Sequence, residues 1–144
     1  MFARTALMIA LVLLAALPPA GSRADEQRLF INLTSDDPLR AGMAVEQATR
    51  AREMLKIPVT IFLSVEGVRL ADTRLPSPVY PTGQPIRKML EHFMAVGGEV
   101  LICPMCMKNV AAIPKDALLE GVRVAGPKVT FPALFAEGTR TLSY

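Results

Sequence analysis

The sequence has little of what most enzyme and metal sites require: one histidine and two cysteines occur in 144 residues. Neither Ser35 nor Ser64 has a histidine near it, so no serine-hydrolase triad is visible. Two cysteines fall short of the ligand set of a structural zinc site, and His92 is the only imidazole. The G-x-G-x-x-G and G-x-x-x-x-G-K-[ST] motifs are absent, as are repeats and low-complexity tracts. Nothing in the sequence therefore supports a nucleotide-binding protein, a zinc enzyme or a solenoid.

Charge of one sign is also scarce. The chain has 16 Lys and Arg against 13 Asp and Glu, a formal net charge of +3. Arg4 and Arg23 lie in an N-terminal leader, and without them the basic excess nearly vanishes. No cluster of basic residues with interleaved aromatic residues occurs either. The sequence therefore predicts no nucleic-acid partner.

The chain has one long hydrophobic run, and it lies near the N-terminus. Residues 6–17 are all apolar, Pro18 and Pro19 end the run, and Ser22-Arg23-Ala24 then has the pattern of a signal-peptide cleavage site. As a helix the run covers about 18 Å, less than the ~30 Å of a bilayer core. We therefore predict a signal peptide over residues 1–24, export to the periplasm, and no stable membrane insertion of the mature domain, residues 25–144.

Strand and helix patterns alternate along the mature chain. Residues 28–34 are apolar and β-prone, and Asp37 and Pro38 then give the cap and first-turn signals of a helix. Residues 59–65 form a nearly continuous apolar run, typical of a strand buried on both faces of a parallel sheet. The alternation predicts an α/β domain with a mostly parallel sheet covered on both faces. The further predicted elements are helices at 39–56, 86–96, 114–120 and 131–137, strands at 99–103, 122–124 and 139–143, and an irregular proline-rich loop at 67–85. We expect Gly97-Gly98 to cap the end of helix 86–96, and Thr130 and Gly138 to cap the two ends of helix 131–137.

Both cysteines lie in one motif, Cys103-Pro104-Met105-Cys106, at the carboxyl end of the predicted strand 99–103. Ligands and reactive groups collect at this edge of open α/β sheets. Backbone N–H groups of a following helical turn, with Lys108 close in sequence, favour a thiolate over a thiol. A disulfide across so short a loop constrains the unfolded chain little, which argues against a purely stabilising bond. The motif therefore predicts reactive thiols.

Three chemistries fit this motif, and the residues alone leave them open. The first is thiol–disulfide exchange, although thioredoxin-like domains place the motif early and here most of the chain precedes it. The second is Cu(I) binding, because Met105 and Met107 add soft sulfur ligands to the cysteines. The third is sulfur carriage, in which a cysteine holds a persulfide and passes the sulfur on.

Several stretches resemble the DsrE-like (DsrE/DsrF-like) sulfur-relay family: RLFINLTSDDP, VTIFLSVEGV, PIRKMLEHFMAVGGEVLICPMCMK, LLEGVRV and TRTLSY. The glycine pair, strand and C-x-x-C are the most specific part, and the resemblance covers nearly the whole mature domain. It implies a flavodoxin-like or Rossmann-like three-layer sandwich with a five-stranded sheet. It also implies a homotrimer or homohexamer and a sulfur-accepting cysteine at Cys103, with Cys106 as its partner.

We therefore expect an exported sulfur-carrier or sulfur-relay-type protein that holds sulfane sulfur on Cys103, with a possible sulfurtransferase-like activity. Its partner would be a sulfur donor or acceptor, either a protein or a small sulfur compound. The alternatives are a periplasmic thiol–disulfide redox protein and a Cu(I)-binding protein. Neither a cofactor nor a metal belongs to the expected site. Asp36 and Asp37 are expected to cap a helix rather than act as an acid–base pair, and Tyr80 to line a pocket or cover the sheet edge.

Overall fold

The computed structural model describes residues 27–144, so the predicted signal peptide lies outside the described residues. Five strands alternate with helices over this range, as the sequence pattern predicts. The elements are β1 (Arg28–Leu33), α2 (Pro38–Arg50), the π-helical turn η3 (Ala51–Leu55), β2 (Val59–Leu63), the 3-10 helix η4 (Val65–Ala71), α3 (Ile86–Ala95), β3 (Glu99–Ile102), α4 (Pro104–Asn109), the 3-10 turn η5 (Lys115–Ala117), β4 (Arg123–Val124), α5 (Pro127–Phe135) and β5 (Thr139–Ser143).

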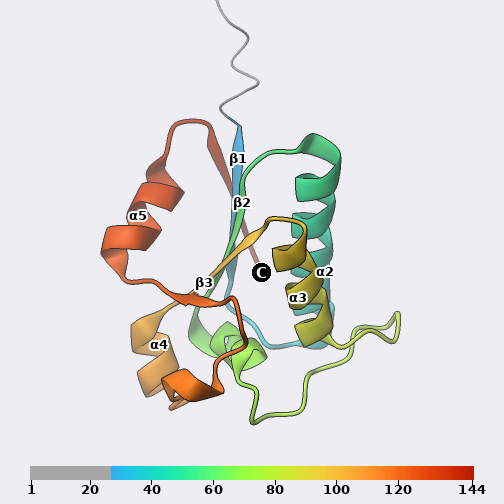
Figure 1. The fold of residues 1–144 in the computed structure, drawn as a ribbon, viewed down its shortest axis with the longest axis vertical. Helices are drawn as coiled ribbons and strands as arrows, with labels where there is room; N and C mark the ends of the chain where they lie inside the picture. The colour runs from blue at the N-terminus through green and yellow to red at the C-terminus, as the bar shows by residue number, and fades with distance from the viewer. Residues whose placement is uncertain (1–26) are drawn as a thin grey trace, which may run out of the picture.

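All the strand pairs in this range are parallel, in the order β4-β3-β2-β1-β5. The chain steps in one direction from β1 to β4 and then crosses back, so that β5 pairs with the far side of β1. Helices α2 and α3 lie on one side of the sheet and α5 on the other (Figure 1). The predicted three-layer α/β sandwich is therefore confirmed.

The main core lies between the sheet and helices α2 and α3. Alternate residues of each strand point to this side, because successive side chains in a strand face opposite ways. Small residues on α2 let that helix pack closely, and each large aliphatic side chain buried here contributes about 1.5–3 kcal/mol. The fully or nearly fully buried residues include Ile31, Leu33, Ala41, Ala44, Val45, Ala48, Ile61, Leu63, Ile86, Leu90, Phe93, Val100 and Ile102.

The start of α2 is fixed by its cap. Asp37 Oδ1 accepts the backbone N–H groups of Leu39 and Arg40 at 3.1 and 3.0 Å, and Pro38 occupies the first helical position. The preceding Asp36 instead forms an ion pair with Arg69 at 3.1 Å. The two aspartates therefore have structural contacts, and the predicted capping role of Asp37 is confirmed.

The stretch predicted as an irregular loop is partly helical. Residues 65–71 form η4, and only the part after it runs without regular structure. Within that part, Tyr80 packs against α2: a Cβ atom on Gly42 would lie 2.0 Å from the Tyr80 ring. Tyr80 thus contacts α2 and packs against the hydrophobic core. The predicted loop is longer than the actual one, because η4 has too few residues to show a helical period in the sequence.

Three other predictions are corrected. The helix expected at 131–137 is α5, which begins at Pro127 because proline is preset for a first helical turn. Thr130, expected to be its cap, is a buried residue inside it whose hydroxyl donates to the carbonyl of Gly126 at 3.0 Å. The helix expected at 114–120 is only the turn η5. Finally, β2 is fully buried on one face alone, since Thr60 and Phe62 on its other face are half-buried.

No helix within residues 27–144 is both long and apolar enough to cross a membrane.

Candidate functional site

Cys103 lies where β3 ends at the carboxyl edge of the sheet. Its backbone N–H donates to the carbonyl of Leu63 at 2.9 Å, which extends the β2–β3 hydrogen bonding by one residue. Cys103 is also the N-cap residue of α4, and Pro104 occupies the first helical position. The sheet on one side and the helix on the other therefore hold this cysteine in place.

The two thiols are free, half-buried and in contact with each other. The Cys106 backbone N–H donates to Cys103 Sγ at 3.3 Å. Burial raises the pKa of the Cys106 thiol, and its hydrogen bond to Cys103 raises it further. Cys106 therefore stays a neutral thiol beside Cys103 near neutral pH. The backbone N–H that donates to Cys103 Sγ is a contact that favours a sulfur nucleophile.

The turn between β2 and η4 contacts the second cysteine. The backbone of Val65 hydrogen bonds to Cys106 and acts against the raised pKa of that thiol. Val65 has a φ of 50°, which is rare for a β-branched residue, and η4 packs against α4. Sequence reasoning missed Val65, because no residue pattern predicts a valine in the left-handed region.

A polar pair lies beside the motif on the neighbouring strands. Since Leu63 pairs with Ile102, the next residues along, Ser64 and Cys103, are neighbours at the sheet edge. The buried Ser64 hydroxyl donates to Asn32 Oδ1 at 2.7 Å. The carboxyl ends of β1, β2 and β3 thus bring Asn32, Ser64 and Cys103 to one edge.

A hollow of about 450 Å³ lies along α4, and we call it the α4 hollow. Its lining is mostly apolar, with the amines of Lys108 and Lys115 at its border. The sequence points to Lys108 but not to Lys115, because α4 and η5 are separate elements along the chain that the fold brings to the same hollow. The lining residues are Pro104, Met107, Lys108, Ala112, Ile113, Pro114, Lys115 and Val124.

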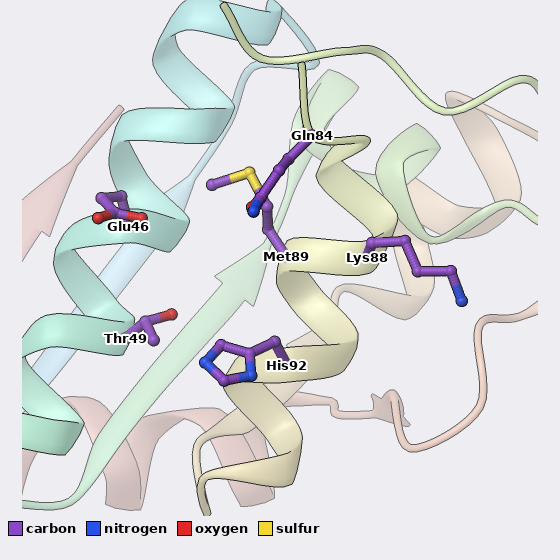
Figure 2. A pocket seen from close by; sticks show the side chains of 6 residues that line it. All are labelled: Glu46, Thr49, Gln84, Lys88, Met89 and His92. Carbon is purple, nitrogen blue, oxygen red and sulfur yellow. The ribbon is translucent and has the colours of Figure 1, made fainter. Parts of the chain in front are cut away.

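A second hollow, of about 270 Å³, lies between α2 and α3 and has no lining residue from α4. Figure 2 shows Glu46 and Thr49 on one helix facing Met89 and His92 on the other. His92 is largely exposed, and its Nε2 lies 3.5 Å from Glu53 Oε1. The only histidine in the sequence is therefore a surface residue that belongs to this groove and not to the cysteine site.

The expected copper ligands do not gather at one point. Met107 is 7% exposed and belongs to the hydrophobic core, whereas Met105 is 68% exposed. Within residues 27–144 no group of three or more His, Cys, Asp and Glu side chains could hold a metal ion. Of the predicted ligands, the fold brings together only the two cysteines.

Comparison with solved structures identifies the fold. The chain superposes on the ychN protein from E. coli with a TM-score of 0.63 and 18% sequence identity, over 83% of this chain and 99% of that one. It superposes on MTH1491 from Methanobacterium thermoautotrophicum, a protein of unknown function, with a TM-score of 0.57 and 14% identity, over 82% and 99% of the two chains. Both neighbours belong to the DsrE/DsrF-like fold family. The fold is DsrE-like.

Identity this low shows the DsrE-like fold and not the activity, and no family model and no curated protein matches the chain. In this domain the cysteine motif follows β3, the third strand in chain order, at the carboxyl edge of the sheet. The chemistry of the site therefore has to be argued from Cys103, Cys106 and their contacts.

Proposed function

We propose that the protein carries sulfane sulfur as a persulfide on Cys103, with Cys106 as the protecting or resolving thiol. The observation that supports this most is the Cys106 amide, which donates to Cys103 Sγ at 3.3 Å beside a Cys106 thiol whose pKa is raised. A DsrE-like fold supports a sulfur-relay role at the level of fold. Whether the carrier also acts as a sulfurtransferase depends on the donor and acceptor.

Loading and release follow from this arrangement. A Cys103 thiolate attacks the outer sulfur of a donor persulfide, the donor's S–S bond breaks, and its electron pair leaves with the donor thiolate. The new S–S bond holds the transferred sulfur on Cys103. An acceptor nucleophile removes the sulfur by the same attack, with Cys103 as leaving group.

Cys106 determines how long the persulfide lasts. If its thiolate attacks Cys103 Sγ, hydrosulfide leaves and a Cys103–Cys106 disulfide forms. The raised pKa of Cys106 keeps it mostly protonated near neutral pH, which slows this attack. The pair therefore supports a carrier whose sulfur persists until an acceptor arrives.

Mass spectrometry of the intact protein tests the proposal. After treatment with inorganic polysulfide and removal of the excess, the wild type should gain one sulfur atom. Cys103→Ser should gain none, whereas Cys106→Ser should gain the sulfur and lose it to intermolecular disulfides. If sulfur loading requires Cys106 and not Cys103, Cys106 is the sulfur acceptor and the proposed assignment of the two cysteines is wrong.

Thiol–disulfide exchange is the second candidate, favoured by the direct contact between the two free thiols. It predicts a reversible loss of two hydrogen atoms in the same mass spectra, with no sulfur gained. A Cu(I) role has less support, because Met107 is in the core.

We also propose that the protein is exported to the periplasm after cleavage of residues 1–24. The apolar run of residues 6–17 and the Ser22-x-Ala24 pattern support this proposal. N-terminal sequencing of the exported protein should begin at Asp25. Protein retained in the membrane with Met1 intact would contradict it.

A homotrimer or homohexamer is proposed on the basis of an apolar patch on α5. Val129, Phe131 and Phe135 are exposed there, and Phe135 is 74% exposed. Light scattering should give a multiple of the monomer mass, and Phe135→Asp should reduce it. Met54→Asp, which changes a side chain of equal exposure on η3, is the matched control. A monomer at high micromolar concentration would refute the assembly.

A further inference from the structure

The α4 hollow begins beside the candidate sulfur site, because Pro104, which lines it, directly follows Cys103. Pro104, Met107 and Lys108 line it from positions one helical turn apart, so one stripe of α4 forms a wall of the hollow. Cys103 is the N-cap residue of α4 and directly precedes Pro104, so it lies at the end of the helix where this stripe begins. At 1.5 Å per residue, Lys108 is about 6 Å farther along the helix axis than Pro104.

The α4 hollow is apolar at its base and basic at its border. Met107 and Ile113 are buried beneath it, and the exposed Val124 of β4 forms a wall. Within residues 27–144, neither Lys108 nor Lys115 takes part in an ion pair, unlike Lys88, which pairs with Glu91 at 2.6 Å.

The nearest acid in sequence, Asp116, forms no ion pair with either lysine among residues 27–144. Its charge contributes to the raised pKa of the Arg74 guanidinium. Arg74 in turn donates to the carbonyl of Ala112 at 3.2 Å. The two lysines therefore present unpaired positive charge to whatever enters the α4 hollow.

We propose that the α4 hollow binds the organic part of a small anionic sulfur donor, a short thiol acid that carries sulfane sulfur. Its carboxylate would contact Lys108 and Lys115, and its carbon chain would cover Met107, Ile113 and Val124. This rests on the proposed function and assigns its donor class. A carboxylate at the lysines and a sulfur at Cys103 require a spacer of a few carbon atoms, which inorganic polysulfide lacks.

The transfer step balances without a further reactant. The outer sulfur of the donor, R–S–S⁻ in the ionised form, forms a bond to Cys103 as the thiol proton of Cys103 passes to solvent. The donor's S–S bond breaks, and its electron pair leaves on R–S⁻, which takes up a proton. The thiol acid then dissociates from the α4 hollow.

Binding can be measured without transfer. Reduced protein is titrated with 3-mercaptopropionate, which has no sulfane sulfur, and followed by NMR shifts of the α4 amides. Lys108→Gln and Lys115→Gln should each weaken binding about tenfold, the effect of one charged contact. Lys128→Gln on α5 makes the same charge change at an exposed site outside the hollow and should leave the affinity unchanged. The neutral amide of the same thiol should bind weakly to all four proteins.

Loading rates then separate this inference from the proposed function. With the persulfide of 3-mercaptopropionate as donor, the Lys108 and Lys115 variants should load Cys103 about tenfold more slowly than the wild type. With inorganic polysulfide they should load at close to the rate of the Lys128 control. Equal slowing with both donors, or equal slowing by the control, would overturn the inference while leaving sulfur carriage intact. If no donor loads Cys103, the proposed function fails, and the titration still decides whether the α4 hollow binds thiol acids.

Discussion

A buried carboxylate, Asp72, is paired with a half-exposed arginine two residues later. The Arg74 guanidinium donates to both oxygens of Asp72, from Nε at 2.9 Å and from an Nη atom at 2.7 Å, and the Arg74 backbone N–H adds a third bond at 3.0 Å. The Asp72 side chain is 1% exposed, whereas that of Arg74 is 49% exposed. The two single substitutions should therefore differ in effect.

Arg74→Ala should reduce the free energy of unfolding by about 3 kcal/mol, because it leaves a buried carboxylate without its cation. Asp72→Ala should reduce it by only about 1.5 kcal/mol, since the half-exposed guanidinium can be hydrated again. Arg74→Ala also removes the exposed hydrogen bond to the Ala112 carbonyl, which contributes little beside the buried carboxylate. The difference between them reflects burial of one partner and not the strength of the contact.

The pH dependence follows from the Asp72 carboxyl group. Its hydrogen bond with Arg74 is the largest effect on its pKa, which lies below the ordinary value of 3.8 despite burial. A lowered folded pKa gives stability that is fully present above the ordinary value and is lost as the pH falls through the folded value. The stability gap between the wild type and Asp72→Asn should therefore close below about pH 4. In Arg74→Ala, burial still raises the pKa of Asp72 and the side chain of Arg74 no longer lowers it. The difference in free energy of unfolding between this variant and the wild type should therefore narrow as the pH falls.

Urea unfolding followed by far-ultraviolet circular dichroism measures these differences, because the sequence has no tryptophan to follow by fluorescence. Urea titrations at neutral pH and near pH 3.5 give, at each pH, the difference in free energy of unfolding between each variant and the wild type. If Asp72→Ala is the more damaging change, or if the Arg74→Ala gap does not depend on pH, the reasoning from burial is refuted.

Two further predictions concern backbone positions. Gly98→Ala should reduce the free energy of unfolding by about 1–3 kcal/mol, since its Cβ would lie 2.2 Å from the buried Phe93 ring, whereas Gly126→Ala, with no atom within 4 Å of its Cβ, should change it by less than about 1 kcal/mol. Equal losses in urea titrations would contradict the steric argument. Val65→Gly should raise the free energy of unfolding by about 1 kcal/mol, because glycine adopts the left-handed backbone conformation of Val65 without strain. Lys56→Gly, at a φ of 57°, should have the same effect. A loss of stability in Val65→Gly would mean that the exposed valine side chain makes a stabilising contact.

Much of the fold follows from short-range signals in the sequence. Asp37 and Pro38 indicate the start of α2, and Gly97, with a φ of 89°, terminates α3 as predicted. Apolar runs indicate β1, β2 and β3, because period and composition are local properties. The strand that leads into Cys103 is also visible in this way, so the position of the motif at the sheet edge could be predicted.

What the sequence leaves undetermined depends on contacts between distant segments. Lys108 and Lys115 border one hollow only because α4 and η5 pack side by side, and no spacing rule predicts that meeting. The contact between Val65 and Cys106 likewise joins two strand ends far apart in the chain. The predicted start of α5 is wrong for a local reason: Thr130 has the residue type of a cap, but Pro127 already occupies the first helical turn.

The Asp72–Arg74 pair also links the stability of the fold to the candidate site. Arg74 donates to the carbonyl of Ala112, and Thr73 donates to the carbonyl of Ala117 from both its backbone N–H and its hydroxyl at 2.9 Å. These bonds hold both ends of residues 112–117, the segment that carries Lys115 and forms one wall of the α4 hollow. Arg74→Ala should therefore weaken 3-mercaptopropionate binding although Arg74 does not line the hollow, and amide exchange in residues 112–117 should speed up in parallel. Faster exchange with unchanged binding would show that the hollow does not depend on this segment being held in place.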